Sequence, residues 1–285
     1  ARTPRFENVT FHPSAAAAQE AGFRPCLRCR PEASPDIALW RGTSNTVARA
    51  LTLIAGGGLD GDETNVDALA TRVGVGERQL RRLFKQHLGA SPIAVAQTRR
   101  VLFAKQLVQE TRLPMIEVAL ASGFGSLRRF NATFRMLYGR PPSELRRRFH
   151  DGSEQPSLGA ADGVTLYVSY RPPYDWSAML AHLEARAVPG VERVTAGRYL
   201  RTVVENGEDG TIEVANAPAR RALAVTIRFP NVRALPAIVG RVKRLFDVGA
   251  DVETIGAELA VDPMLASLIE RRPGLRVPGA WDRFE

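Results

Sequence analysis

The sequence predicts a multi-domain protein in which an all-α region precedes an α+β region, with a short cysteine-containing segment ahead of both. Three observations indicate this architecture. The 285 residues exceed what one ordinary hydrophobic core accommodates. The spacing of apolar residues changes from helical to alternating after a stretch of linker composition. Within the all-α region, one stretch occurs twice at an offset of 50 residues.

Shifts in composition mark the expected boundaries of these regions. Residues 1–36 are rich in Pro, Ala and Arg and contain a short helical patch at 13–21. Residues 45–149 have apolar positions at helical spacing, with Gly or Pro at the breaks. Residues 150–163 have the composition of a linker, and residues 164–285 form the α+β region.

Alternating apolar residues predict strands in the last region, and helical spacing predicts helices between and after them. The expected strands are Val164–Tyr170, Arg198–Glu205, Gly210–Ala217 and Ala222–Phe229. The expected helices are Trp176–Ala187, Ala234–Phe246, Asp251–Glu258 and Asp262–Glu270. We expect these helices to pack on an antiparallel sheet as two layers.

The repeat predicts two helix-turn-helix units. "GERQLRRLFKQHLGASP" (Gly76–Pro92) matches "SLRRFNATFRMLYGRPP" (Ser126–Pro142). Upstream, the glycines Gly74 and Gly123 correspond at an offset of 49, so the second turn is predicted to be one residue longer. Each copy comprises a short helix, a glycine turn and a longer Arg-rich helix, and one further helix over 92–109 joins the copies.

In each unit the apolar positions of the longer helix are expected to pack inward and to leave the opposite face for the DNA major groove. That face carries Glu77, Arg78, Gln79, Arg81, Arg82 and Lys85 in the first copy, and Ser126, Leu127, Arg128, Arg129, Asn131, Thr133 and Arg135 in the second. Arg and Gln suit bidentate contacts to guanine and adenine, whereas Lys and Thr suit phosphates. Of these, we predict DNA contacts for Arg78, Gln79, Arg81, Arg82, Lys85, Ser126, Arg128, Arg129, Asn131 and Arg135. The alternative is that each Arg-rich helix is only a solvated face.

The distribution of charge points to double-stranded DNA as the partner. The formal net charge is +9, and residues 67–148 hold 16 Lys and Arg against 5 Asp and Glu. The basic excess therefore lies in the repeat region, as expected of a DNA-binding domain. A uniformly basic surface would instead have suggested solubility or a weak attraction to membranes.

The segment between the copies, "GASPIAVAQTRRVLFAKQLV", and the closing "FGSLRRFNATFRMLYGRPPSELR" resemble the AraC/XylS DNA-binding domain. The resemblance covers nearly all of residues 45–149. It implies a transcription regulator with two recognition helices and RNA polymerase as a second partner. One departure is Leu127-Arg-Arg129, where many relatives carry small polar residues.

The only two cysteines, Cys26 and Cys29, are separated by two residues. This spacing suits half of a tetrahedral zinc site better than a structural disulfide. Two free thiols in a loop are the alternative. No signal-peptide pattern and no run of 18 apolar residues occurs, so we expect a cytoplasmic protein with no membrane partner.

The flanking sequence "FHPSAAAAQEAGFRPCLRCRPEASP" resembles the end of the Ada-type zinc domain, in which four cysteines bind one zinc. The resemblance assigns Cys26 and Cys29 as zinc ligands and places the other two cysteines, one of them the methyl-accepting nucleophile, upstream of this sequence. No residue here matches that nucleophile. His12 is the nearby substitute ligand, and an ordinary surface histidine is the simpler interpretation.

Three stretches of the last region, "YRPPYDWSAMLAHLEARAVPGVERV", "LFDVGAD" and "RRPGLRVPGAWDRFE", resemble the N-terminal domain of AlkA-type 3-methyladenine DNA glycosylases. In that family the catalytic aspartate lies beyond the junction with which this sequence ends, so we expect no catalytic residue here. Asp175 and Trp176 belong to the family's turn before a helix. We expect them to cap and pack that helix, with contact to a flipped base as the alternative.

The order of the three resemblances is that of fused proteins of the adaptive response to DNA alkylation. It implies a sequence-specific transcription regulator. The alternative function is a DNA-3-methyladenine glycosylase with a methylphosphotriester-accepting zinc domain, whose chemistry we expect to lie outside this sequence. A zinc-dependent interaction module is a third hypothesis, which only the cysteine pair favours.

Overall fold

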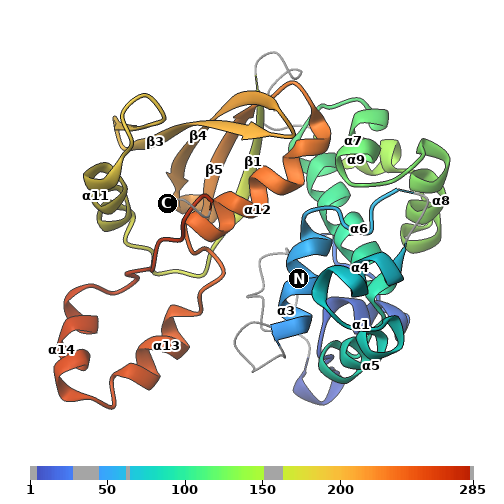
Figure 1. Cartoon of the computed structure of the whole chain (residues 1–285), viewed down its shortest axis with the longest axis horizontal. Coiled ribbons are helices and arrows are strands. Elements are labelled where there is room, and N and C mark those ends of the chain that lie inside the picture. Colours follow the sequence, from blue (N-terminus) through green and yellow to red (C-terminus); the bar gives the residue numbers. More distant parts are fainter. Residues whose placement is uncertain (1–4, 28–44, 62–64, 151–162, 283–285) are drawn as a thin grey trace.

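The computed structural model of the chain describes residues 5–27, 45–61, 65–150 and 163–282 (Figure 1). A 3₁₀ turn, η1 (Phe6–Asn8), opens the first range. Helix α1 (Ala15–Glu20) follows, and its first turn is capped by the Ser14 hydroxyl, which accepts the backbone N–H of Ala17. The short helix predicted near residues 13–21 is therefore confirmed. The predicted linker lies largely outside the described residues.

The middle ranges are helical throughout, as predicted. The helices are α3 (Asn45–Ala55), α4 (Val66–Val73), α5 (Glu77–Leu88), α6 (Pro92–Glu110), α7 (Met115–Ala121), α8 (Leu127–Tyr138) and α9 (Pro142–His150). Helix α6 begins at Pro92, where a missing N–H costs nothing, and the Ser91 hydroxyl caps it. It connects the two copies of the repeat and is the longest helix described.

The last range contains a five-stranded antiparallel sheet with the order β1-β5-β4-β3-β2. Its strands are β1 (Val164–Ser169), β2 (Glu192–Thr195), β3 (Arg198–Glu205), β4 (Glu208–Ala217) and β5 (Ala222–Arg228). One 3₁₀ turn, η3 (Pro218–Arg220), lies between β4 and β5, and another, η4 (Val232–Ala234), follows β5. The four predicted strands are confirmed. The short edge strand β2 was missed because its four residues offer too little alternation, and pairing with β3 creates it.

Helices cover one face of this sheet, which gives the two layers that were predicted. In β3, Tyr199 and Val203 are buried, whereas Thr202 and Val204 on the opposite face are exposed. The ring of Phe246 packs against Tyr199, with 5.5 Å between ring centroids. The helices are α11 (Trp176–Arg186), α12 (Leu235–Leu245), α13 (Val252–Leu259) and α14 (Pro263–Arg271). Helices α11 and α12 belong to the second layer. The expected packing of α13 and α14 on the sheet was wrong, because both project away from it and neither has a buried residue (Figure 1).

The buried apolar residues of the helical region form two separate clusters. One cluster joins α3, α4 and α5 and reaches α6 at Ala96. The other begins on α6 at Val101, includes α7 and α8, and continues into the sheet region. The second helix-turn-helix unit therefore shares its core with the sheet region, while the first unit has a core of its own.

The sheet is joined to α6 at the outer edge of β1. The Tyr167 N–H donates to Glu110 Oε2 at 2.9 Å, and the Tyr167 carbonyl accepts from Gln106 Nε2 at 3.1 Å. Gln106 Nε2 also donates to the Glu110 carboxylate at 3.0 Å, which holds both side chains in place. An edge strand exposes backbone groups that invite unwanted pairing, so these side chains satisfy and cover part of the edge.

Replacing Glu110 with Ala should lower the free energy of unfolding by about 2 kcal/mol, because the β1 edge loses a charged acceptor. Glu184 on α11 is exposed, so Glu184→Ala should change the free energy by less than about 0.5 kcal/mol. Urea unfolding followed by circular dichroism measures both values. Equal effects of the two substitutions would contradict the stabilising role of the edge contact.

Candidate nucleic-acid interface

The two helix-turn-helix units repeat each other down to their glycine conformations. Gly74 and Gly123 both have φ +82°, and Gly89 and Gly139, which end α5 and α8, have φ +68° and +70°. A residue with a Cβ is strained in this left-handed region. The repeat in sequence therefore encodes a repeat of turn geometry.

The predicted extra residue of the second turn is confirmed by the helix caps. In the first unit, one residue separates Gly74 from Gly76, the N-cap of α5. In the second unit, two residues separate Gly123 from Ser126, the N-cap of α8. The two N-caps differ. The Ser126 hydroxyl caps α8 by accepting the Arg129 N–H at 3.3 Å, whereas Gly76 has no side chain with which to cap α5.

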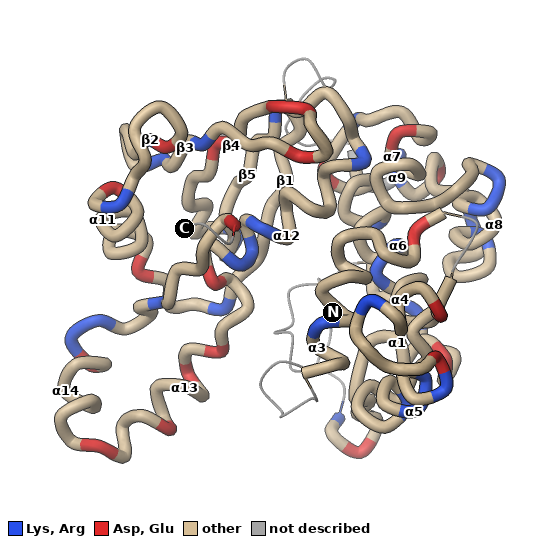
Figure 2. The backbone as a smooth tube through the Cα atoms, in the orientation of Figure 1, with Lys and Arg blue, Asp and Glu red and all other residues tan. Residues whose placement is uncertain are grey.

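Apolar residues hold both longer helices from the inside. Leu80 and Phe84 of α5, and Phe130 and Phe134 of α8, are completely buried. In α8, Phe130 also packs against Phe124 of the preceding turn, with 5.3 Å between ring centroids. The Lys and Arg positions of α5 and α8 lie on the side of the molecule away from α11, α13 and α14 (Figure 2).

On α5, all five predicted DNA-contacting side chains are exposed. They are Arg78, Gln79, Arg81, Arg82 and Lys85. Arg81 Nε donates to Glu77 Oε1 at 2.7 Å, and Arg82 Nη2 donates to Gln79 Oε1 at 2.9 Å. These contacts lie at the surface, so DNA can replace them at small cost.

The second copy presents a narrower exposed face. Of the predicted contacts, Arg128, Arg129 and Arg135 are exposed, whereas Ser126 and Asn131 are half-buried. The outward placement of Thr133 was wrong: this residue is 7% exposed, and its Oγ1 lies 3.4 Å from Gln97 Nε2 of α6. Leu127 is half-buried against the core. Helical spacing could not distinguish Thr133 from its neighbours because α6 covers that side of α8.

The N-terminal segment packs at the corner between α5 and α6. The Ser14 hydroxyl donates to the Leu88 carbonyl at 2.6 Å, and Thr98 Oγ1 lies 3.1 Å from Gln19 Oε1. Lys85 Nζ lies 2.9 Å from the Gly89 carbonyl and 3.4 Å from the Glu20 carboxylate. Lys85 thus lies at the C-terminal end of α5, beside the N-terminal segment.

Cys26 is exposed, and the backbone beside it is held by α6. Lys105, which is 1% exposed, donates from Nζ to the Cys26 carbonyl at 3.2 Å, and Gln109 Nε2 donates to the Leu27 carbonyl at 2.8 Å. Cys29 lies outside the described residues. Among those described, no group of three potential ligands forms a metal site. The two cysteines of the sequence fit half of a four-thiolate zinc shell.

His12 is half-buried rather than freely exposed. Its ring lies 5.2 Å from that of Phe23, and its Nε2 is buried with no hydrogen-bond partner among the described residues. The sequence analysis did not identify Lys105 and Gln109 as the residues that hold the backbone beside Cys26. One signal could have indicated them. Helix α6 has no wholly polar side, which is typical of a helix packed on several sides, so its Lys and Gln side chains are expected to need partners.

In the sheet region, Asp175 and Trp176 have the structural roles that were expected. Asp175 caps α11 by accepting the Ala178 N–H at 2.9 Å, and this hydrogen bond lowers the pKa of the carboxyl group. Trp176 Nε1 donates to the Gly197 carbonyl at 3.0 Å, and its ring stacks on Phe246.

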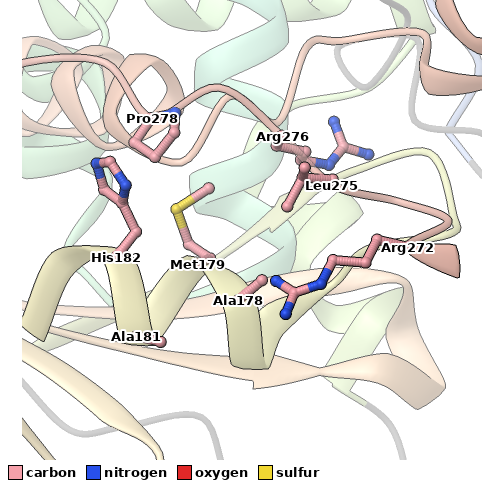
Figure 3. Close-up of a pocket in the computed structure, with 8 residues that line it drawn as sticks. All are labelled: Ala178, Met179, Ala181, His182, Arg272, Leu275, Arg276 and Pro278. Carbon is pink, nitrogen blue, oxygen red and sulfur yellow. The ribbon is translucent and has the colours of Figure 1, made fainter. Parts of the chain in front are cut away.

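A hollow of about 360 Å³ lies between α11 and the segment after α14 (Figure 3). Its lining is mainly aliphatic, with His182 on α11 and Arg272 at opposite sides. None of the eight described residues drawn around it is an Asp or Glu.

Three family models match the chain in succession. The metal-binding domain of Ada matches residues 1–32, a helix-turn-helix domain matches residues 69–148, and the AlkA N-terminal domain matches residues 165–282. The chain joins an Ada-type, an AraC-type and an AlkA-type region. All three resemblances found in the sequence are therefore confirmed.

Of the described helices, none is long and apolar enough to cross a membrane.

The chain is similar over its whole length to a bifunctional transcriptional activator/DNA repair enzyme AlkA of Mycobacterium tuberculosis, with 40% identity over 285 residues. It spans 56% of that relative, about half of its length. DNA-3-methyladenine glycosylase 2 of Escherichia coli is 32% identical over 118 residues, which are 41% of this chain and 40% of the relative. The transcriptional regulator GbdR of Pseudomonas aeruginosa is 39% identical over 82 residues, 29% of this chain and 22% of the relative.

Among solved structures, an AraC-type transcriptional regulator from Chromobacterium violaceum covers 39% of this chain and 98% of its own, with 32% identity and a TM-score of 0.34. The C-terminal domain of AraT from Geobacillus stearothermophilus covers 40% of this chain and 94% of its own, with 26% identity and a TM-score of 0.35.

Gly89 and Gly139, the glycines that end α5 and α8, provide a matched test of how the N-terminal segment packs on the first unit. A Cβ at Gly89 would lie 2.7 Å from Pro13 Cγ, whereas a Cβ at Gly139 would meet nothing within 4 Å. Both Ala substitutions should lower stability by about 1 kcal/mol through backbone strain. Only Gly89→Ala should accelerate amide hydrogen exchange in α1, as measured by mass spectrometry. Unchanged exchange in Gly89→Ala would show that this contact does not hold α1.

Proposed function

We propose that this chain is the DNA-binding part of a sequence-specific transcription regulator that responds to DNA alkylation. The observation that carries the proposal is the pair of helices α5 and α8. Each presents exposed Arg residues outward and is held by buried aromatic and aliphatic residues on its inner side. Such a helix fits the major groove, and Arg suits bidentate contact to guanine. The local basic excess supplies attraction to phosphates.

The partners follow from the same proposal. Double-stranded DNA is the first partner, contacted by the ten candidate residues of α5 and α8. RNA polymerase is the second, because the relative matched over the whole chain is named a transcriptional activator. Base excision of alkylated bases is a further activity that we propose for the whole protein, on the basis of the AlkA N-terminal match at residues 165–282. We assign no catalytic residue of this chain to it.

Duplex binding should depend steeply on salt and on the arginines of both helices. Arg81→Ala/Arg82→Ala should weaken binding by about 1–3 kcal/mol, because one member of the pair is expected to contact a base. The same loss is expected for Arg128→Ala/Arg129→Ala. Fluorescence anisotropy with a selected duplex, from about 50 to about 200 mM salt, measures the effects.

A matched control for these variants is Arg186→Ala/Arg193→Ala, which removes the same charge from exposed positions in the sheet region. This control should retain near wild-type affinity. If it weakened binding as much as Arg81→Ala/Arg82→Ala, only the overall charge would matter and α5 would not be a reading helix.

We propose that Cys26 and Cys29 are zinc ligands of the intact protein. Two thiolates are half of a tetrahedral shell, so this chain alone should bind zinc more weakly than about 1 μM, whereas four-ligand sites gain about 10 kcal/mol or more. Competition with a chromophoric chelator measures the affinity, and Cys26→Ser should weaken it further. Tight stoichiometric zinc on a monomer, lost in Cys26→Ser, would refute the half-site and implicate His12.

A further inference from the structure

A polar network occupies the joint between the two helix-turn-helix units. The apolar core of the first unit ends on α6 at Ala96, and that of the second begins at Val101. The intervening turn of α6 carries Gln97, Arg99 and Arg100. No single apolar cluster spans this joint in the part of the chain described, so polar contacts hold the two units together there.

Asp60, in the loop between α3 and α4, is the centre of this network. Its carboxylate lies 3.2 Å from Arg99 Nη1 and 3.2 Å from Arg100 Nε. The Arg100 side chain is only 2% exposed. It also donates from Nη1 to Gln97 Oε1 at 3.2 Å and from Nη2 to the Leu59 carbonyl. The carboxylate therefore compensates a guanidinium that is almost removed from water.

The network is anchored firmly in the first unit. Leu59 is 1% exposed in the first core, and the Gly58 N–H donates to the Leu53 carbonyl at the end of α3 at 2.8 Å. Asp60 follows Leu59 directly in the chain, so its position is tied to the core that supports α5.

The same network reaches the second unit at two points. The Gly61 N–H donates to the carbonyl of Gly123, the turn glycine of the second unit, at 3.1 Å. A Cβ at Gly123 would lie within 2.5 Å of the Asp60 carboxylate oxygens, so the loop packs directly on this turn. Gln97 in turn contacts Thr133, which is buried on the inner side of α8.

We propose that Asp60 is a positioning residue for DNA recognition, which sets the angle between α5 and α8 and thereby the spacing of the two half-sites. A network of buried hydrogen bonds and ion pairs is directional, so it allows one arrangement where apolar packing would allow several. Recognition helices on one face of DNA must match half-sites about one helical turn apart. The inference rests on the proposed function, in which both helices contact DNA.

The test compares duplexes that carry both selected half-sites at spacers varied one base pair at a time. The wild-type chain should prefer one spacer. Asp60→Asn, which keeps the shape but removes the charge, should reduce that preference about tenfold while leaving the affinity for a single half-site within about twofold. Asp67→Asn is the matched control, because it removes one negative charge from an exposed position in the first turn of α4, and it should keep the preference.

Gln97→Ala is a second variant, which removes the contact to α8 and the acceptor for Arg100 Nη1 but leaves the Asp60 ion pairs in place. Gln97 is half-buried and Ala is a strong helix former, so this variant should keep the fold. It therefore tests whether the network sets the spacer preference even if Asp60→Asn does not fold. Both variants should broaden the spacer preference. Wild-type spacer preference in folded variants overturns the inference. Absence of paired half-site binding by the wild-type chain overturns the proposed function itself.

Discussion

The polar side chains of α6 bind backbone and side-chain groups of every other region described, and the arrangement of the chain depends on these contacts. Arg100 lies against the first helix-turn-helix unit, Lys105 holds the backbone of Cys26, and Gln106 with Glu110 holds the edge of β1. Burying such groups is unfavourable unless each finds a partner. Helix α6 is therefore buried on several sides only because the other regions supply those partners.

This central position of α6 explains why the outward faces of α5 and α8 remain at the surface. The contacts to the backbone of Cys26 and Leu27 and to the sheet are made by residues 105–110, at the C-terminal end of α6, whereas the inner side of α8 is held by Gln97 and apolar residues. The arginines of α5 and α8 are left at the surface. The second helix-turn-helix unit and the AlkA-type region thus share an apolar core, and the outward face of α8 takes no part in it.

Much of the fold could be predicted because local sequence determines it. The repeat reproduced the glycine conformations of both copies, at an offset of 49 residues for the turn glycines and 50 for those that end α5 and α8, since a left-handed backbone requires the same residue in each copy. Strands with clear alternation were found, but β2 was not, because its four residues, none of them buried, become a strand only when β3 lies beside them. The same limit applied to Thr133, whose burial depends on α6.

By itself, the sequence determined the order of the three regions, the two helix-turn-helix units and the identity of their outward arginines. These features are local, since periodicity, glycine positions and charge are written in consecutive residues. Only the tertiary structure decided which buried polar groups meet across the chain. Asp60 and Arg100 are 40 residues apart, and Glu110 and Tyr167 are 57 apart. No local pattern distinguishes such residues from solvated ones, because their partners are brought to them by the packing of other elements.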